Sequence, residues 1–310
     1  MGKRNWLVVM LLVVFTLTLV VGCGQQNGGG KEKNGEASGD TAYPLTLTDA
    51  MGREITLEAK PERIVSIMPS LTEILFALDA GERVVGVTTY CDYPPEAQEK
   101  EVIGDLYNLN PEKILALEPD LVLVGKSETL QQTFDFLEQS AVPYFVVDPQ
   151  TLDEIEESIL TIAKLIDARA EGDALVAQLA ADRAALEAKV ASIPAEERPK
   201  VFVLLDTSAL YTVGSGTFLS EMITTAGADN VVADFDNGYF QISEETLFEI
   251  DPEIIICTYP MRDEVLAREA WQDLAAVKNE RVYDVDSNAV SRPGPRYVQG
   301  LELLYEVFAK

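Results

Sequence analysis

A repeated motif divides this chain of 310 residues into two related halves. The segment EKILALEPDLVLV, which begins at Glu112, aligns without a gap with ETLFEIDPEIIIC, which begins at Glu245, at a constant offset of 133 residues. Both copies have the pattern of a short helix, a proline turn and an apolar strand. A weaker echo sets GERVVG from Gly81 beside GADNVVAD from Gly227. A chain of this kind is expected to form two similar lobes with a ligand site between them.

Apolar strand-like runs alternate with amphipathic helical stretches in both halves. In the first half, strands are expected at 63–68, 83–87, 120–124 and 144–147, and helices at 70–81, 128–140 and 152–166. In the second half, strands are expected at 200–206, 253–258 and 281–285, with helices at 218–227 and at the C-terminus. This alternation predicts mainly parallel sheets that are covered by helices on both faces.

A stretch rich in Ala, Leu, Glu and Lys, residues 168–193, separates the two halves. Its high helix propensity predicts one long helix. The predicted fold class is therefore α/β, with two similar Rossmann-like lobes joined by a single long α-helix. The expected boundaries are an N-terminal lobe at 45–167, the linking helix at 168–194 and a C-terminal lobe at 195–310. Since bending this helix would break backbone hydrogen bonds, we expect modest lobe movement.

The N-terminus has the order of a secretory signal. Lys3 and Arg4 precede the apolar stretch from Trp6 to Val21, and a Gly-Cys junction ends at Cys23. This order is typical of a bacterial lipoprotein signal at 1–23, with Cys23 as the lipidated residue. The alternative is a permanent transmembrane helix, although sixteen apolar residues fall short of the ~20 needed to span a bilayer. Residues 24–44 are poor in apolar side chains and predict a flexible tether.

Composition excludes several functions. The chain has 52 acidic and 24 basic residues, so its surface repels nucleic acid and anionic lipid headgroups. It has no histidine, which removes the usual general base and the usual soft-metal ligand. The glycine-rich VGSGT at Val213 lacks the lysine of a phosphate loop, and no nucleophile elbow or metal-ligand cluster is present. We therefore expect neither an enzyme nor a metal site.

With these features together, the chain resembles the solute-binding lipoproteins of bacterial ABC importers, in the helical-backbone class that serves cobalamin, ferric siderophores and haem. Four stretches are similar to the cobalamin-binding branch: PSLTEILFAL from Pro69, YCDYPPEA from Tyr90, NPEKILALEPDLVL from Asn110 and SRPGPR from Ser291. The resemblance covers about residues 45–309. It implies an extracytoplasmic monomer, lipid-anchored to the outer face of the cell membrane, that partners permease subunits with their ATPase.

The resemblance also implies a role for Glu112 and Glu245. In such proteins one glutamate on each lobe docks onto arginines of the permease. Either acid alone would be an ordinary first-turn residue that complements the helix dipole, worth ~0.3–1 kcal/mol. Their repeat-equivalent positions favour docking, since two separated charges fix orientation better than one patch.

A corrinoid is broad, partly apolar and rich in amides, so its site should offer aromatic faces and a few polar groups. The expected ligand-binding residues lie in loops of both lobes: Tyr90, Tyr107, Tyr211, Tyr239, Phe240, Asn288 and Arg292. The alternative for each aromatic is core or rim packing, and for Arg292 it is bracing the turn before the last helix. No protein cofactor is expected, because the ligand implied by the resemblance is itself a cobalt corrinoid, which can arrive with its own axial base.

The chain departs from the family pattern where the described pockets have tryptophans. It has Leu106 and Tyr107 at one such place, Gly125 and Lys126 at another, and Asn288 where an acidic ligand contact is usual. Cobinamide is therefore as credible as cobalamin. A ferric siderophore or haem in the same class of protein, or a tethered sensor that signals without transport, remains an alternative. Haem commonly takes His, Met or Tyr as its axial ligand.

Overall fold

The computed structural model describes residues 41–310, apart from the side chain of Glu128. The predicted signal, Cys23 and most of the predicted tether lie outside the described residues. Thr41 and Tyr43 fall within the predicted tether, yet both are held against the first lobe. The Thr41 amide donates to Asp167 Oδ1 at 2.6 Å, and the Tyr43 hydroxyl donates to the Leu165 carbonyl at 2.9 Å. The folded body therefore begins before Leu45.

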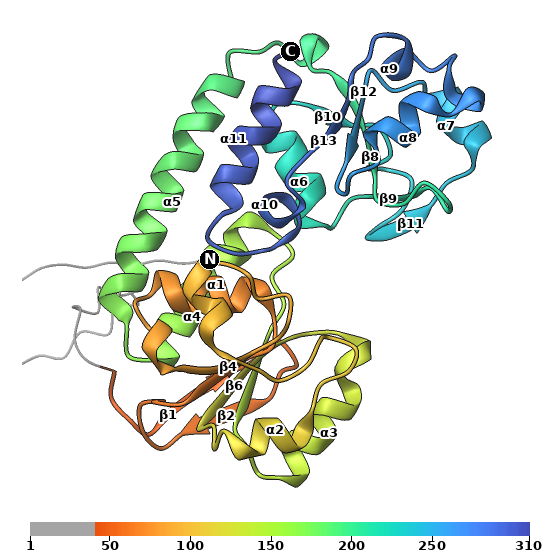
Figure 1. Ribbon diagram of the computed structural model, residues 1–310. Coiled ribbons are helices and arrows are strands. Elements are labelled where there is room, and N and C mark those ends of the chain that lie inside the picture. The colour runs from red at the N-terminus through yellow and green to blue at the C-terminus, as the bar shows by residue number, and fades with distance from the viewer. Residues whose placement is uncertain (1–40) are drawn as a thin grey trace, which may run out of the picture. The chain divides into compact units, whose positions relative to one another are not determined.

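A parallel sheet forms the centre of each lobe (Figure 1), with five strands in the first and four in the second. In the first lobe the order is β5-β4-β3-β6-β7, with β3 at Ile64–Ser66, β4 at Val84–Val87, β5 at Glu101–Val102, β6 at Leu121–Gly125 and β7 at Tyr144–Val147. In the second lobe the order is β10-β8-β12-β13, with β8 at Lys200–Leu204, β10 at Asp229–Asn230, β12 at Ile254–Cys257 and β13 at Val282–Asp284. The order β4-β3-β6-β7 thus matches β10-β8-β12-β13, and the predicted fold class is confirmed.

Two antiparallel ribbons flank the sheets. The first joins β1 at Leu45–Thr48 to β2 at Glu54–Leu57. The second joins β9 at Tyr211–Val213 to β11 at Tyr239–Gln241. The second ribbon contains residues that were expected in loops, which changes how their side chains are presented.

Helices cover both sheets. The first lobe has α1 at Pro69–Ala77, α2 at Pro111–Ala116, α3 at Gln131–Gln139 and α4 at Leu152–Leu165. The second has α6 at Phe218–Thr225, α7 at Glu244–Ile250, α8 at Arg262–Ala267, α9 at Ala275–Lys278, α10 at Ser287–Ser291 and α11 at Tyr297–Phe308. The linking helix α5 spans Arg169–Val190 and runs from one lobe to the other (Figure 1). Within residues 41–310, no helix is both long enough and apolar enough to cross a membrane.

The central strands alternate their side chains between two cores, because successive residues of a strand point to opposite faces. On β6, Leu121 and Leu123 face a core that also contains Leu186 of α5 and Val203 of β8, which we call the shared core. The neighbouring Val122 faces a core that belongs to the first lobe alone. On the second-lobe strands the outward residues, Phe202, Leu204, Ile255 and Cys257, likewise form a separate core. The lobes are therefore joined by buried apolar contact as well as by α5, which supports the expectation of modest lobe movement.

A buried carboxylate fastens the first ribbon to the edge of the first sheet. The Asp49 side chain is fully buried and accepts hydrogen bonds from the backbone of Met51 and Arg53 and from the Arg53 guanidinium at 2.5 Å. Its Oδ2, which binds the Arg53 guanidinium, also accepts from the Val146 amide of β7 at 3.3 Å. Burial by itself would raise the pKa of Asp49, but these hydrogen bonds and the charge of Arg53 more than offset it and hold the pKa below its usual value.

We expect Asp49→Asn to lower the free energy of unfolding by about 1–3 kcal/mol at neutral pH, because a charged acceptor of buried donors is lost. A depressed pKa in the folded state gives stability that is present above the unfolded pKa of about 4 and is lost as the pH falls through the folded pKa. Urea unfolding between pH 2 and pH 7 should therefore show a weaker acid dependence for the variant. Glu54→Gln, on the exposed face of the same ribbon, is the control. Equal pH profiles for Asp49→Asn and the native protein would contradict this role.

Candidate functional site

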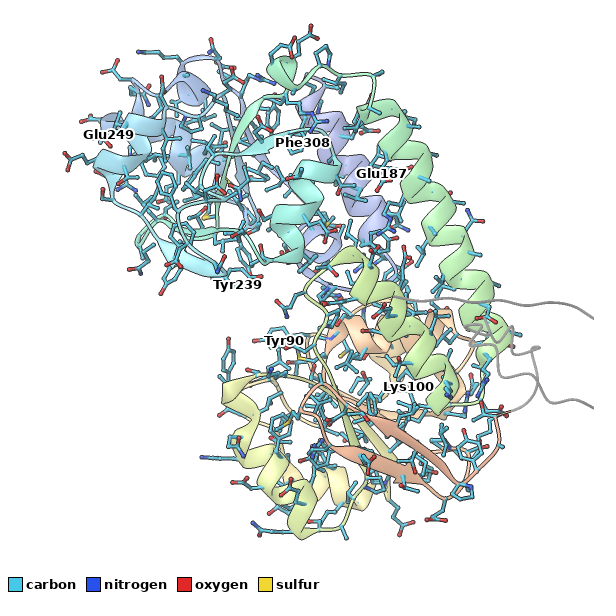
Figure 2. The ribbon with its side chains drawn as sticks, turned by 180° about the vertical axis from the view of Figure 1, so that it is seen from behind. Tyr90, Lys100, Glu187, Tyr239, Glu249 and Phe308 are labelled. Atoms are coloured by element: carbon cyan, nitrogen blue, oxygen red, sulfur yellow. The ribbon has the colours of Figure 1, made fainter. Side chains whose placement is uncertain are left out.

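All the exposed aromatic side chains of the described residues except Phe248 on α7 lie in segments that follow the carboxyl ends of the parallel strands. This edge of an open α/β sheet is where ligands usually bind, because the connecting loops there are free to carry specific side chains. The exposed fractions of the predicted residues are 47% for Tyr90, 73% for Tyr107, 41% for Tyr211 and 59% for Tyr239. Tyr90 belongs to the first lobe and Tyr239 to the second (Figure 2). We call these four residues, with the three of the next paragraph, the exposed aromatic set.

Three further members were missed by sequence reasoning: Tyr93 after β4, Phe235 after β10 and Tyr259 after β12, with exposed fractions of 43%, 53% and 60%. Each follows the end of a parallel strand closely in sequence. The rule that ligand-binding loops follow parallel strands would have found Tyr93 and Tyr259, whereas Phe235 follows β10, a strand that was not expected from the sequence.

The ribbon β9–β11 corrects the expectation that Tyr211, Tyr239 and Phe240 lie in loops. Tyr239 pairs with Val213 and Phe240 with Thr212. Since neighbouring residues of a strand point to opposite faces, Tyr239 and Phe240 face in opposite directions. Phe240 packs against the separate core of the second lobe, whereas Tyr239 is exposed. The ribbon therefore offers Tyr239 to a ligand and uses Phe240 for packing.

Arg292 has partners in the other lobe. Its Nη1 donates to Glu73 Oε1 at 2.9 Å and to Asp92 Oδ1 at 2.7 Å, and its Nη2 donates to the Tyr90 carbonyl at 3.1 Å. Asn288 donates to the other Asp92 oxygen at 3.5 Å. Burial by itself would raise the pKa of Asp92, but the hydrogen bond and charge of Arg292 outweigh it and lower the pKa. In this structure Asn288 and Arg292, which were predicted to contact the ligand, thus bind residues of the first lobe.

The helices α2 and α7 are repeat-equivalent in detail. Each follows a side-chain cap: Asn110 Oδ1 accepts from the Lys113 amide, and Ser243 Oγ accepts from the Thr246 amide. After each helix an acid adopts a left-handed conformation before a proline, with φ of 47° at Glu118 and 45° at Asp251. All these pairs share the offset of 133 residues. The same local chemistry therefore builds the same turn in both lobes.

Glu112 and Glu245 are the second residues of these two helices, and both are exposed. Among residues 41–310 neither carboxylate has a hydrogen-bond or ion-pair partner. The adjacent Glu244 is different, because its Oε1 accepts from Arg268 Nη2 at 2.5 Å and from Trp271 Nε1 at 3.0 Å. Of these two neighbouring glutamates, Glu244 is thus bound within the lobe, whereas Glu245 is free to bind a partner.

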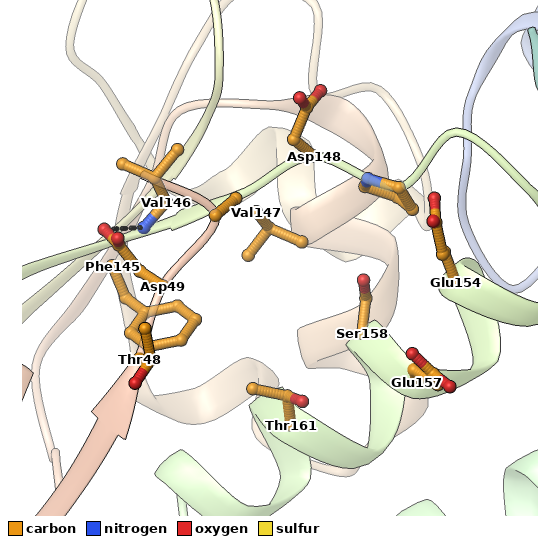
Figure 3. Close-up of a pocket in the computed structure, with 12 residues that line it drawn as sticks. Thr48, Asp49, Phe145, Val146, Val147, Asp148, Glu154, Glu157, Ser158 and Thr161 are labelled. Carbon is orange, nitrogen blue, oxygen red and sulfur yellow. Dashed lines mark hydrogen bonds between the residues drawn. The ribbon is translucent and has the colours of Figure 1, made fainter. Parts of the chain in front are cut away.

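The described cavities are small. One of about 240 Å³ lies between β7 and α4 (Figure 3) and is lined by first-lobe residues alone. Its acidic lining residues are Asp49, Asp148, Glu154 and Glu157. It contains no predicted ligand-binding residue and is smaller than the ~300–1,000 Å³ of ordinary ligand pockets. A second, of about 280 Å³, lies beside Tyr107 and reaches Pro111, the first residue of α2. One predicted ligand-binding residue, Tyr107, thus lies near the start of the helix that carries Glu112.

Comparison with known proteins gives consistent relatives. Residues 64–289 match the family described as periplasmic binding protein. The chain is 35% identical to an uncharacterized ABC transporter substrate-binding lipoprotein, YvrC, of Bacillus subtilis, over 99% of this chain and 97% of that protein.

Two solved structures share the fold. A possible iron-binding periplasmic solute-binding protein of Staphylococcus epidermidis has a TM-score of 0.72 at 31% identity, over 81% of this chain and all of that one. The periplasmic vitamin B12 binding protein of Vibrio cholerae has a TM-score of 0.72 at 28% identity, over 80% of this chain and 97% of that one.

We expect Glu244→Gln to destabilise the protein by about 1–2 kcal/mol, because it weakens a partly exposed, charge-assisted hydrogen bond to Arg268. Glu245→Gln should change stability by less than about 0.5 kcal/mol, as for an exposed residue without contacts. Urea unfolding followed by the fluorescence of Trp271 measures both variants. Equal losses of stability would show that the two glutamates do not have different structural roles.

Proposed function

Because the chain belongs to the periplasmic binding protein family, we propose that it captures a cobalt corrinoid between its two lobes and delivers it to an ABC importer. At the coarser level, it is an ABC transporter substrate-binding protein of the class that serves cobalamin, siderophores and haem. Such proteins are transport components rather than enzymes, and they work with permease and ATPase subunits. The proposal includes a monomeric, extracytoplasmic body that is anchored through a lipid on Cys23.

The exposed aromatic set is the observation that carries the corrinoid proposal. Aromatic rings bury large flat areas at little cost in conformational entropy, so exposed tyrosines from both lobes suit a broad, partly apolar macrocycle. Both lobes contribute residues to the set, with Tyr90 and Tyr107 from the first lobe and Tyr239 and Tyr259 from the second. A guest held by both lobes would then contact several rings at once.

Charge on these loops favours a neutral or cationic guest. The cations that contact the loop of Tyr90 and Tyr93 are already neutralised: Arg292 by Glu73 and Asp92, and Arg296 by Glu73. Among residues 41–310, the exposed Asp234 and Asp236 of the second lobe have no ion-pair partner. Cobalamin is neutral and cobinamide is cationic, whereas haem carries two propionates. Like charges that approach one another without water between them are repelled, so haem is disfavoured.

Haem is the second candidate, because the phenol group of an exposed tyrosine can serve as an axial ligand of the haem iron. The chain has no histidine for that role. A corrinoid that arrives with its own axial base needs no axial ligand from the protein, so its binding should depend on the faces of the tyrosine rings and not on any phenol oxygen.

Titration of the purified protein with cyanocobalamin, dicyanocobinamide, haemin and ferrioxamine tests the guest. We expect saturable quenching of Trp271 by the corrinoids, since they absorb where tryptophan emits. Tyr107→Ala and Tyr239→Ala should each weaken corrinoid binding roughly ten- to hundredfold. Phe248→Ala, an exposed aromatic on α7, is the control. Tight binding of haemin with no corrinoid binding would replace the corrinoid proposal by the haem one.

We further propose that Glu112 and Glu245 dock onto cationic side chains of the permease. Each is an unpaired carboxylate at the start of a short helix, in the same position of each lobe. A pair of separated charges defines the orientation of the protein on a two-fold permease better than a single patch does. Because neither carboxylate has a partner among residues 41–310, each can pair with the permease without breaking an ion pair within those residues.

The double variant Glu112→Ala/Glu245→Ala should bind the guest normally and lose uptake in cells that carry the permease and ATPase. Glu249→Ala, another exposed acid on α7, should keep both activities. Normal uptake by the double variant would remove the docking proposal. Normal guest binding and docking without accumulation inside the cell would instead favour a tethered sensor.

A further inference from the structure

A buried carboxylate of the first lobe holds two arginines of the second. The Glu73 side chain on α1 is 1% exposed, and those of Arg292 and Arg296 are each 13% exposed. Arg296 binds Glu73 with two parallel bonds, from Nε to Oε2 at 2.8 Å and from Nη2 to Oε1 at 2.7 Å. Arg292 adds a third bond, from Nη1 to Oε1 at 2.9 Å. These three bonds, from three donor nitrogens to the two Glu73 oxygens, favour a fixed geometry.

Both arginines also contact one loop of the first lobe, residues 90–93. Arg292 binds the Asp92 carboxylate and the Tyr90 carbonyl. The guanidinium of Arg296 lies over the Tyr93 ring, with its carbon 4.2 Å from the ring centroid. Each guanidinium thus contacts Glu73 and the loop at the same time. The loop is held from the opposite lobe, by residues about 200 positions away in the sequence.

The charges of this group are balanced, with two arginines against Glu73 and Asp92. Burial of unpaired charge is costly, so each member depends on the others being in place. A lysine could supply the charge of Arg296 but neither the two parallel bonds nor the flat cation that stacks on an aromatic ring. The geometry thus requires arginine for reasons beyond charge.

We infer that Glu73, Arg292 and Arg296 are positioning residues that hold Tyr90 and Tyr93 as a preformed aromatic wall for the guest. In this inference Arg292 acts through the loop and does not contact the guest itself. When the two rings are already ordered in the free protein, binding the guest costs no further side-chain conformational entropy. The affinity is therefore higher. The inference rests on the proposed ligand site, and it adds that the second lobe completes the aromatic surface of the first.

The variant Arg296→Lys tests this role without leaving a buried acid unpaired. We expect cyanocobalamin affinity to fall roughly three- to thirtyfold, as measured by calorimetry, because the stacking contact that orders Tyr93 is lost. Amide hydrogen exchange of residues 88–94 should become faster in the ligand-free protein. The matched control is Arg183→Lys on α5, whose guanidinium also pairs with first-lobe acids, Asp153 at 2.7 Å and Glu156 at 3.7 Å, but contacts no residue of the loop.

A double variant separates positioning from general stabilisation. If Arg296 acts through Tyr93, then Arg296→Lys should weaken binding much less in the Tyr93→Ala background than in the native one. Equal affinity losses in the two backgrounds, or unchanged exchange of residues 88–94, would overturn the inference. Exchange needs no ligand, so its outcome is read even if no corrinoid binds. Faster exchange without corrinoid binding would reject the guest and retain the positioning role.

Discussion

The continuous shared core is the constraint on which the rest of the structure depends. Strands of both sheets direct alternate side chains into it, and Leu179, Leu186 and Val190 of α5 complete it. Apolar burial of this kind is non-directional and strong, about 25 cal/mol per Å². It keeps the two lobes together while leaving their loops to vary. The polar contacts between the lobes then add direction, as between the Tyr297 hydroxyl and Glu156 at 2.5 Å or between the Leu152 amide and Glu221 at 2.8 Å.

The sequence repeat explains why both lobes present similar features at the same places. An acid after the proline turn starts the central strand in each case: Asp120 accepts from the Arg63 amide, and Glu253 accepts from the Lys200 amide. The offset between these acids is again 133 residues. Residues that fix the turns and the strand starts have therefore been kept in both halves, whereas the loops that carry the aromatic set differ in length and composition.

The mainly parallel sheets, the two lobes and the linking helix could be predicted from the sequence, because periodicity and helix propensity act over short stretches. The starts of α2 and α7 were also predictable from the repeat. The role of Arg292 was not, since its partners Glu73 and Asp92 lie about 200 residues away and no local pattern relates them. A weak signal was present: Glu73 is a lone acid among Leu71, Ile74 and Leu75 on a buried helix, where a charge requires a partner.

The division of the aromatic wall between a loop and two distant arginines limits how such proteins can be recombined. A chimera that takes its first lobe from one relative and its second from another would pair a foreign loop with unfamiliar guanidinium groups. The charges of this group would stay balanced only in a hybrid that has Glu73 and Asp92 in its first lobe and Arg292 and Arg296 in its second. In this scaffold the lobes are structurally repeated, yet they are not interchangeable modules.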